Sequence, residues 1–183
     1  TQIGPSGNAP RPDEGRDDAL YELGIALERF PVTDSPHLWL PDRLLRHLLA
    51  DASGNMHRAE IRVDTLYAPE RQSRRLGQIL LQSFAMAPIS KLASLQALLV
   101  RALIAHFKRR PYAEPLVRWE SQLHDRFMLP QVLWDDFSSV IRDLNESGFP
   151  LQQDWFQSIF ELNFPRLGRV QIGDITLELR RAH

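Results

Sequence analysis

The chain has 183 residues, a length that fits one domain with a substantial hydrophobic core. Apolar residues make up 43% and charged residues 25% of it, which is typical of globular proteins and excludes a disordered or fibrous chain. With 22 basic and 23 acidic side chains, it has no net charge that would attract nucleic acid or an anionic membrane surface.

The chain contains no cysteine, which excludes disulfides, thiolate nucleophiles and Cys-ligated metal centres. No apolar run reaches the roughly 18 residues of a membrane span, and the N-terminus lacks a secretory pattern. We therefore expect a cytoplasmic protein without nucleic-acid or membrane partners. Because the sequence begins with Thr1, we also expect it to be a fragment of a longer chain.

The first half of the chain is predicted to contain a tail and two helices. Residues 1–16 are rich in proline and glycine and almost free of apolar side chains, which predicts a flexible tail or linker before a single domain over residues 17–183. Leucines then recur at helical spacing in two segments. They predict one helix over about residues 17–30 and another from about Trp39 to Ala50.

The clearest predicted strand runs from Asn55 to Tyr67, because mostly apolar side chains alternate there with charged ones. One face is predicted to be core and consists of His57, Ala59, Ile61, Val63 and Thr65. The other face is charged and consists of Arg58, Glu60, Arg62 and Asp64. The apolar segment from Gln78 to Met86 is predicted as the antiparallel partner, since the connection is too short for a crossover helix.

The second half of the chain is predicted to begin with helices. The segment from Ser90 to about Lys108 is apolar around most of its circumference, so we expect a buried helix that forms the spine of the core. Helical spacing continues from Pro130 to Asn145, and Gly148 is placed to end that helix. A further short helix is predicted over Gln152–Ser158.

Two strands are predicted to close the chain. The first covers Ile159–Phe164 and is followed by a turn from Pro165 to Gly168; the second runs from Val170 to Arg180 with a kink at Gly173 and Asp174. Strands that do not alternate regularly with helices favour the α+β class. We therefore predict a mainly antiparallel sheet of about four strands, backed by helices.

Carboxylates on these strands provide one candidate site. Glu60, Glu161 and Glu178 face away from their apolar neighbours, and carboxylates that converge from adjoining strands can hold Mg²⁺ together with a nucleotide. Arg58, Arg62 and Arg180 alternate with the acids and can hold phosphate oxygens through two hydrogen bonds each. The alternative is a solvated sheet face held by cross-strand salt bridges, which explains the same pattern.

Two further groups have both a structural and a functional interpretation. His57 lies on the apolar face, where a histidine is either a hydrogen-bonded core residue or part of a site. His124, Asp125 and Arg126 form either a capping and ion-pair corner or part of a site, and no motif places a nucleophilic serine near them. The motifs of dinucleotide oxidoreductases, P-loop kinases, α/β-hydrolases and zincins are absent, which disfavours those classes.

Several blocks of sequence occur in an order that resembles a known family. They are Arg11–Glu14, Leu20–Leu23, Gly54–Ile61, Leu116–Trp119, Leu123–Pro130, Trp134 with Asp136 and Phe137, and Leu177–Arg180. Together they resemble a bacterial amidoligase family, usually found as the C-terminal part of large proteins that begin with a transglutaminase-like domain. The resemblance covers nearly the whole chain.

The resemblance implies a fold similar to glutamine synthetase and glutamate–cysteine ligase, in which an antiparallel sheet carries metal-binding glutamates and phosphate-binding arginines. For an ATP-dependent carboxylate–amine ligase of this kind, it implies Glu60 and Glu178 as Mg²⁺ ligands and Arg58 and Arg180 as ATP-phosphate ligands. The secondary candidates are His57, Arg62, Glu161, Arg118, His124, Asp125 and Arg126.

The chain departs from the family pattern at two places. The segment Leu80–Met86 lacks two acids and an arginine that the resemblance implies there, and Asn163 stands where an arginine is expected. These losses keep a second hypothesis open. In it, the chain is a degenerate, non-catalytic module that binds a protein partner or other domains of its parent chain.

Overall fold

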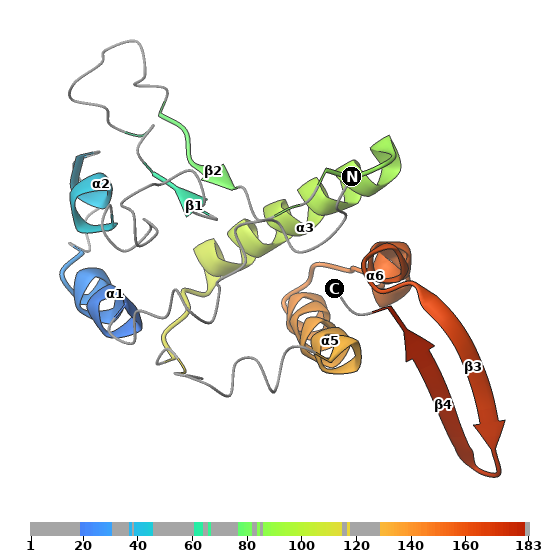
Figure 1. The fold of residues 1–183 in the computed structure, drawn as a ribbon. Helices are drawn as coiled ribbons and strands as arrows, with labels where there is room; N and C mark the ends of the chain where they lie inside the picture. The colour runs from blue at the N-terminus through green and yellow to red at the C-terminus, as the bar shows by residue number, and fades with distance from the viewer. Residues whose placement is uncertain are drawn as a thin grey trace. The chain divides into compact units, whose positions relative to one another are not determined.

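The computed structural model describes residues 19–30, 37, 39–45, 61–63, 66, 77–81, 84, 86–114, 117 and 129–181 (Figure 1). They fall into two compact units: residues 86–114 with 129–181, and the described residues from 19 to 84 with 117. The predicted tail over residues 1–16 lies outside the described residues. A single domain over residues 17–183 stays a prediction.

The unit that contains residues 19–84 has two short helices and one pair of strands. Helix α1 (Ala19–Glu28) confirms the first predicted helix, and α2 (Trp39–Leu45) confirms the start of the second, whose residues 46–50 lie outside the described part. Strand β1 (Ile61–Arg62) pairs with β2 (Leu80–Leu81) in an antiparallel manner, with Ile61 opposite Leu81. The predicted antiparallel partnership is therefore confirmed over this short stretch.

The predicted core face of the first strand is only partly correct. Val63 is buried, with 4% of its surface exposed, but Ile61 is 45% exposed although alternation placed it on the same face. Strand structure ends at Arg62, so the two-residue period that would bring Ile61 and Val63 to one face does not continue.

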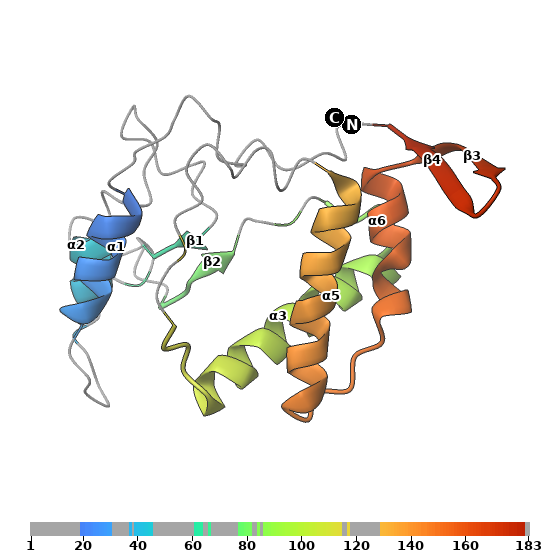
Figure 2. The ribbon, with the colours of Figure 1, turned by 90° about the horizontal axis from the view of Figure 1, so that it is seen from below.

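The other unit is built on two long helices. Helix α3 (Ser90–Arg109) and helix α5 (Pro130–Glu146) match the predicted bounds closely. They are followed by the 3₁₀ turn η4 (Gln153–Phe156) and helix α6 (Gln157–Asn163). Figure 2 shows α5 and α6 side by side, with α3 crossing them.

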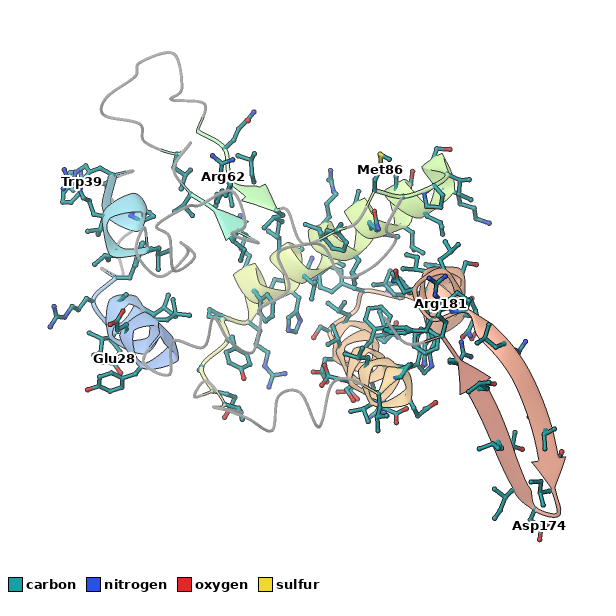
Figure 3. All side chains as sticks on the ribbon, viewed as in Figure 1. Glu28, Trp39, Arg62, Met86, Asp174 and Arg181 are labelled. Carbon is teal, nitrogen blue, oxygen red and sulfur yellow. The ribbon has the colours of Figure 1, made fainter. Side chains whose placement is uncertain are left out.

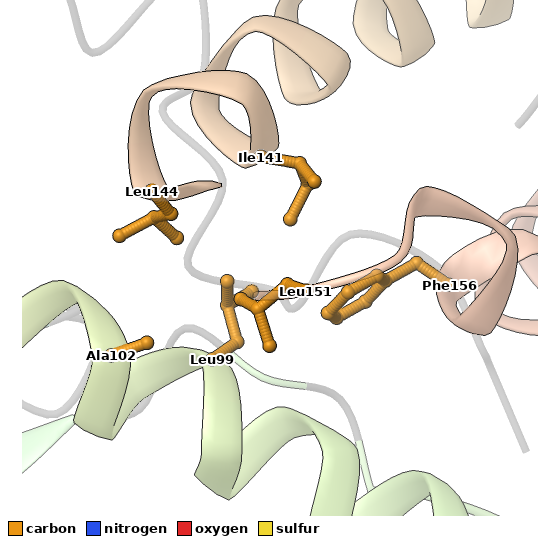
Figure 4. Packing of buried hydrophobic residues seen from close by; sticks show 6 residues of the cluster. All are labelled: Leu99, Ala102, Ile141, Leu144, Leu151 and Phe156. Atoms are coloured by element: carbon orange, nitrogen blue, oxygen red, sulfur yellow. The ribbon is translucent and has the colours of Figure 1, made fainter. Parts of the chain in front are cut away.

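A single apolar cluster joins these elements (Figure 4). Its buried members come from α3, α5 and the segment after α5, and they are Leu99, Ala102, Ile141, Leu144, Leu151 and Phe156. The prediction that α3 is buried nearly all round is wrong, because Leu98 and Ile104 on it are 44% and 58% exposed. Helix α3 therefore contributes one face to this core.

A backbone hydrogen bond at Gly148 and the side chain of Asn145 hold the end of α5 in place. Gly148 adopts a positive φ of 86°, which only glycine tolerates readily, and its N–H donates to the Asn145 carbonyl at 3.0 Å. The Asn145 side chain then exchanges two hydrogen bonds with the Leu151 backbone, at 2.8 and 2.9 Å. These bonds confirm Gly148 as the helix end and direct the chain back toward the core.

The predicted strand Ile159–Phe164 is wrong, because most of this segment lies in helix α6. Phe156, Phe160 and Phe164 follow one another at helical spacing of four residues. The Phe160 ring packs against Trp134 of α5 with centroids 4.8 Å apart, and Phe156 packs against Phe137 at 5.0 Å. Aromatic packing against α5 therefore outweighs the short alternation that had indicated a strand.

The C-terminal strand pair is a hairpin made of β3 (Arg166–Ile172) and β4 (Ile175–Arg180). The predicted kink at Gly173 and Asp174 is the hairpin turn itself, and Gly173 supplies the positive φ of 59° that a two-residue turn needs. The predicted turn at 165–168 is wrong, since β3 already begins at Arg166. Val170 lies opposite Leu177 in the antiparallel register.

The α+β class is confirmed. All four described strands pair in an antiparallel manner, but they form two separate two-stranded sheets rather than one sheet of four. Among the described residues, no helix is both long and apolar enough to cross a membrane.

Candidate functional site

The structure describes only part of the predicted site. Glu161, Glu178 and Arg180 lie in the unit with the C-terminal hairpin, whereas Arg62 lies on β1 in the other unit. The remaining predicted residues lie outside the described part of the chain; they are His57, Arg58, Glu60, Arg118, His124, Asp125 and Arg126.

The Arg180 guanidinium is the centre of a cluster where β4 meets α6. Glu161 accepts two parallel hydrogen bonds from it, from Nη1 to Oε2 at 3.1 Å and from Nη2 to Oε1 at 3.0 Å. Arg180 Nε donates to Glu178 Oε1 at 2.5 Å, and Nη1 also donates to the Phe164 carbonyl at 2.7 Å. Glu161 and Glu178, two of the three strand carboxylates singled out in the sequence, therefore contact one guanidinium, Glu161 from a helix and Glu178 from a strand.

Backbone and aromatic contacts fix the position of this cluster. The Arg180 guanidinium carbon lies 4.9 Å from the centre of the Phe160 ring, close enough for a cation–π contact. The Arg181 N–H donates to the Pro165 carbonyl at 3.0 Å and closes the root of the hairpin. Arg166, opposite Arg180 in the register, reaches Glu178 Oε2 at 3.6 Å.

Arg180 and Glu161 each shift the pKa of the other. The hydrogen bonds from Arg180 hold the pKa of Glu161 below its ordinary value, although partial burial of the carboxylate opposes this shift. The same bonds raise the pKa of Arg180. The Arg180 side chain is 15% exposed, against 34% for Glu161 and 31% for Glu178. Glu161 therefore stays ionised at neutral pH, and both carboxylates remain partly exposed to solvent.

A protein-family model described as "Putative amidoligase enzyme" matches residues 1–183. The chain belongs to this amidoligase family. The resemblance noted from the sequence blocks is thus confirmed. No curated protein and no solved structure matches the chain, so its association with a transglutaminase-like domain and its likeness to glutamine synthetase stay predictions.

Glu161 and Glu178 carry the oxygen donors that Mg²⁺ takes as ligands, but both carboxylates bind the Arg180 guanidinium. This ion takes oxygen ligands and is usually held by one or two carboxylates together with waters and substrate phosphates. The two carboxylates converge on the cationic Arg180 side chain, which occupies the point between them. The described residues contain no group of three or more metal-ligating side chains, so the rest of such a shell would come from phosphate, water or other parts of the chain.

The hydrogen-bond donors of Arg180 are mostly occupied. A guanidinium has five N–H donors, and four hydrogen bonds are made to Glu161, Glu178 and Phe164. A phosphate held by two hydrogen bonds would therefore have to replace a carboxylate. Glu161 is the natural candidate because it occupies the two-pronged position that phosphate prefers.

Two contributors to the cluster were not predicted. Arg166 was missed because its approach to Glu178 depends on the hairpin register, which requires the turn to be placed at Gly173. Phe160 was missed because residues 159–164 were interpreted as a strand. The spacing of Phe156, Phe160 and Phe164 was the signal that could have revealed it.

Proposed function

We propose that this amidoligase-family chain is part of an ATP-dependent ligase that joins an amine to a carboxylate. The observation that supports the proposal is the convergence of Glu161 and Glu178 on one guanidinium, in a chain that belongs to this family. Such a reaction converts the carboxylate and ATP into an acyl phosphate and ADP, and the amine then displaces phosphate from the carbonyl carbon, so the protein must position and neutralise phosphate charge. ATP-dependent chemistry also agrees with the cytoplasmic location expected from the sequence.

The roles follow from the chemistry of the side chains. Glu60 and Glu178 are proposed as Mg²⁺ ligands, and the ion would supply positive charge to the ATP phosphates. Arg58 and Arg180 are proposed to hold phosphate oxygens. Glu161 holds Arg180 in position until an anion replaces it.

Calorimetric titration with ATP in excess Mg²⁺ tests this proposal. Wild type is expected to show saturable binding that Glu60→Ala and Glu178→Gln each weaken at least about tenfold, because each loses one charged ligand. Glu146→Gln is the matched control, since Glu146 is an exposed acid at the end of α5. Unchanged ATP affinity in both site variants would reject the assigned roles.

A second candidate function is a non-catalytic interaction or scaffolding module. It is favoured by the internal use of four Arg180 hydrogen bonds, which is what a structural ion pair requires. It is also favoured by Leu80, Gln82, Ala85 and Asn163, which stand where the family resemblance implied charged residues. A folded wild type without ATP affinity would support this module, and micromolar ATP binding would contradict it.

A further inference from the structure

The C-terminal hairpin carries an apolar surface that no described residue covers. Its members come from both strands and are 54% to 71% exposed: Val170, Ile172, Ile175, Leu177 and Leu179. We call this set the apolar hairpin face. Every residue of β3 is exposed, and in β4 only Arg180 is partly buried.

The register places these five residues on one side of the hairpin. Val170 pairs with Leu177 and Ile172 pairs with Ile175, and residues opposite one another in a strand pair point to the same face. The polar residues Arg169, Gln171, Thr176 and Glu178 occupy the other face by the same register. A hairpin of two strands is marginally stable alone, and a continuous exposed apolar face marks an interaction surface.

The two ends of the apolar hairpin face carry opposite charges (Figure 3). Asp174 lies at the tip, in the turn between the strands, and Arg181 lies at the root next to α6. Arg181 directly follows β4, and its N–H bond to the Pro165 carbonyl continues the strand pairing by one residue beyond Arg180, which places Arg181 on the side of Leu177 and Leu179. The surface is therefore an apolar strip with an acidic end and a basic end.

We propose that two copies of this chain associate through the apolar hairpin face, with the two hairpins stacked face to face and antiparallel about a two-fold axis. In this arrangement, Asp174 of each copy lies over Arg181 of the other, so each charged end meets its opposite. A parallel stacking would place like charges together. Charge complementarity thus selects a second copy, in one orientation, as the occupant of this surface.

The size of the surface sets the expected strength of the association. Five aliphatic side chains, each more than half exposed, cover several hundred Å² in each copy. Their burial would give an interface on the order of 1,000 Å² in total, near the lower limit for specific complexes. We therefore expect a reversible dimer whose population depends on protein concentration.

Sedimentation equilibrium of the whole chain from roughly 1 to 100 µM tests the proposal, because this range covers the affinities expected of a small interface. Wild type should shift from monomer toward dimer as the concentration rises. Leu177→Lys should abolish the shift, and Val170→Lys, on the opposite strand, should do the same. Thr176→Lys is the matched control: it adds the same charge to the neighbouring residue on the polar face and should leave the dimer intact.

A charge exchange tests the orientation and the identity of the partner. Asp174→Arg and Arg181→Asp should each weaken the dimer, and the double variant should restore it, because only a second copy exchanges both charges at once. Far-UV circular dichroism confirms that each variant is folded. The proposal would be overturned if wild type stays monomeric across the concentration range. It would also be overturned if Thr176→Lys and Leu177→Lys reduce the dimer population equally. Failure of the double variant to restore the dimer would overturn the antiparallel arrangement.

Discussion

Glu161 on α6 and Arg180 at the end of β4 form a two-pronged ion pair, with both N–O distances between 3.0 and 3.1 Å. The two residues are 19 positions apart in the sequence. Their contact joins the hairpin to helix α6. It also fixes one carboxylate and one guanidinium of the proposed ligase site.

Replacing Arg180 with alanine is expected to loosen the hairpin. The variant loses charge-assisted bonds to two carboxylates and leaves the Phe164 carbonyl without this donor. Because Glu161 is 34% exposed and solvent screens the pair, we expect a loss of about 1 kcal/mol in unfolding free energy. Hydrogen exchange of the β3 and β4 amides, together with urea denaturation, measures the effect.

Arg169→Ala is the matched control for this prediction. Arg169 lies on the same hairpin and pairs with Glu178 in the register, but its side chain is exposed. The Arg169→Ala variant should change the hydrogen-exchange rates of the β3 and β4 amides little. Equal acceleration of exchange in the two variants would show that the Arg180 cluster does not hold the hairpin.

The contribution of Glu161 to stability is expected to disappear in acid. Its pKa is held below the ordinary value of 4.5, chiefly by the hydrogen bonds from Arg180. A depressed folded-state pKa stabilises the fold above the unfolded-state pKa, and this stabilisation is lost as the pH falls through the folded-state value. Glu161→Gln should therefore be less stable than wild type at neutral pH, and the difference should shrink below about pH 4.5.

Urea denaturation of both proteins between about pH 7 and pH 3 measures this difference, and the range spans the ordinary titration of a glutamate. Glu146→Gln, which changes an exposed acid at the end of α5, provides the reference for general acid destabilisation. If the difference in unfolding free energy between wild type and Glu161→Gln grows as the pH falls, the ion pair between Glu161 and Arg180 is contradicted.

Truncating Leu144 is expected to destabilise the core of α3 and α5 strongly. Leu144 is 1% exposed and belongs to the apolar cluster of that unit. Leu144→Ala should cost about 3 kcal/mol, because it removes buried surface and leaves a cavity. Leu98→Ala, the same change at an exposed position of α3, should cost less than about 1 kcal/mol. Comparable midpoints of chemical denaturation for the two variants would show that Leu144 is not in a close-packed core.

Two glycine substitutions are expected to change stability in opposite directions. An added Cβ would meet no atom within 4 Å at either Gly148 or Gly24, so only the backbone conformation distinguishes them. Gly148 has a positive φ, and Gly148→Ala should cost about 1 kcal/mol. Gly24 lies inside helix α1, and Gly24→Ala should stabilise that helix by about 0.5–1 kcal/mol. Thermal melts followed by circular dichroism measure both changes. Shifts of the melting temperature in the same direction would contradict this reasoning.

Part of the candidate site was predictable from the sequence. Glu178 and Arg180 belong to a block that resembles the amidoligase family, and both lie in the cluster at the hairpin root. Glu161 was predicted as a secondary candidate, but on a strand. It contacts Arg180 because helix α6 places it over the end of β4, and no spacing within the sequence specifies that approach.

The sequence by itself determined the α+β class, the family, and the two long helices. Helices α3 and α5 repeat their apolar residues every three or four positions over several turns, so local periodicity is enough to define them. Tertiary structure decided the state of residues 157–163 and which faces are buried. Short segments carry too few residues for a clear period, and their conformation depends on partners distant in the sequence, as the packing of Phe160 against Trp134 shows.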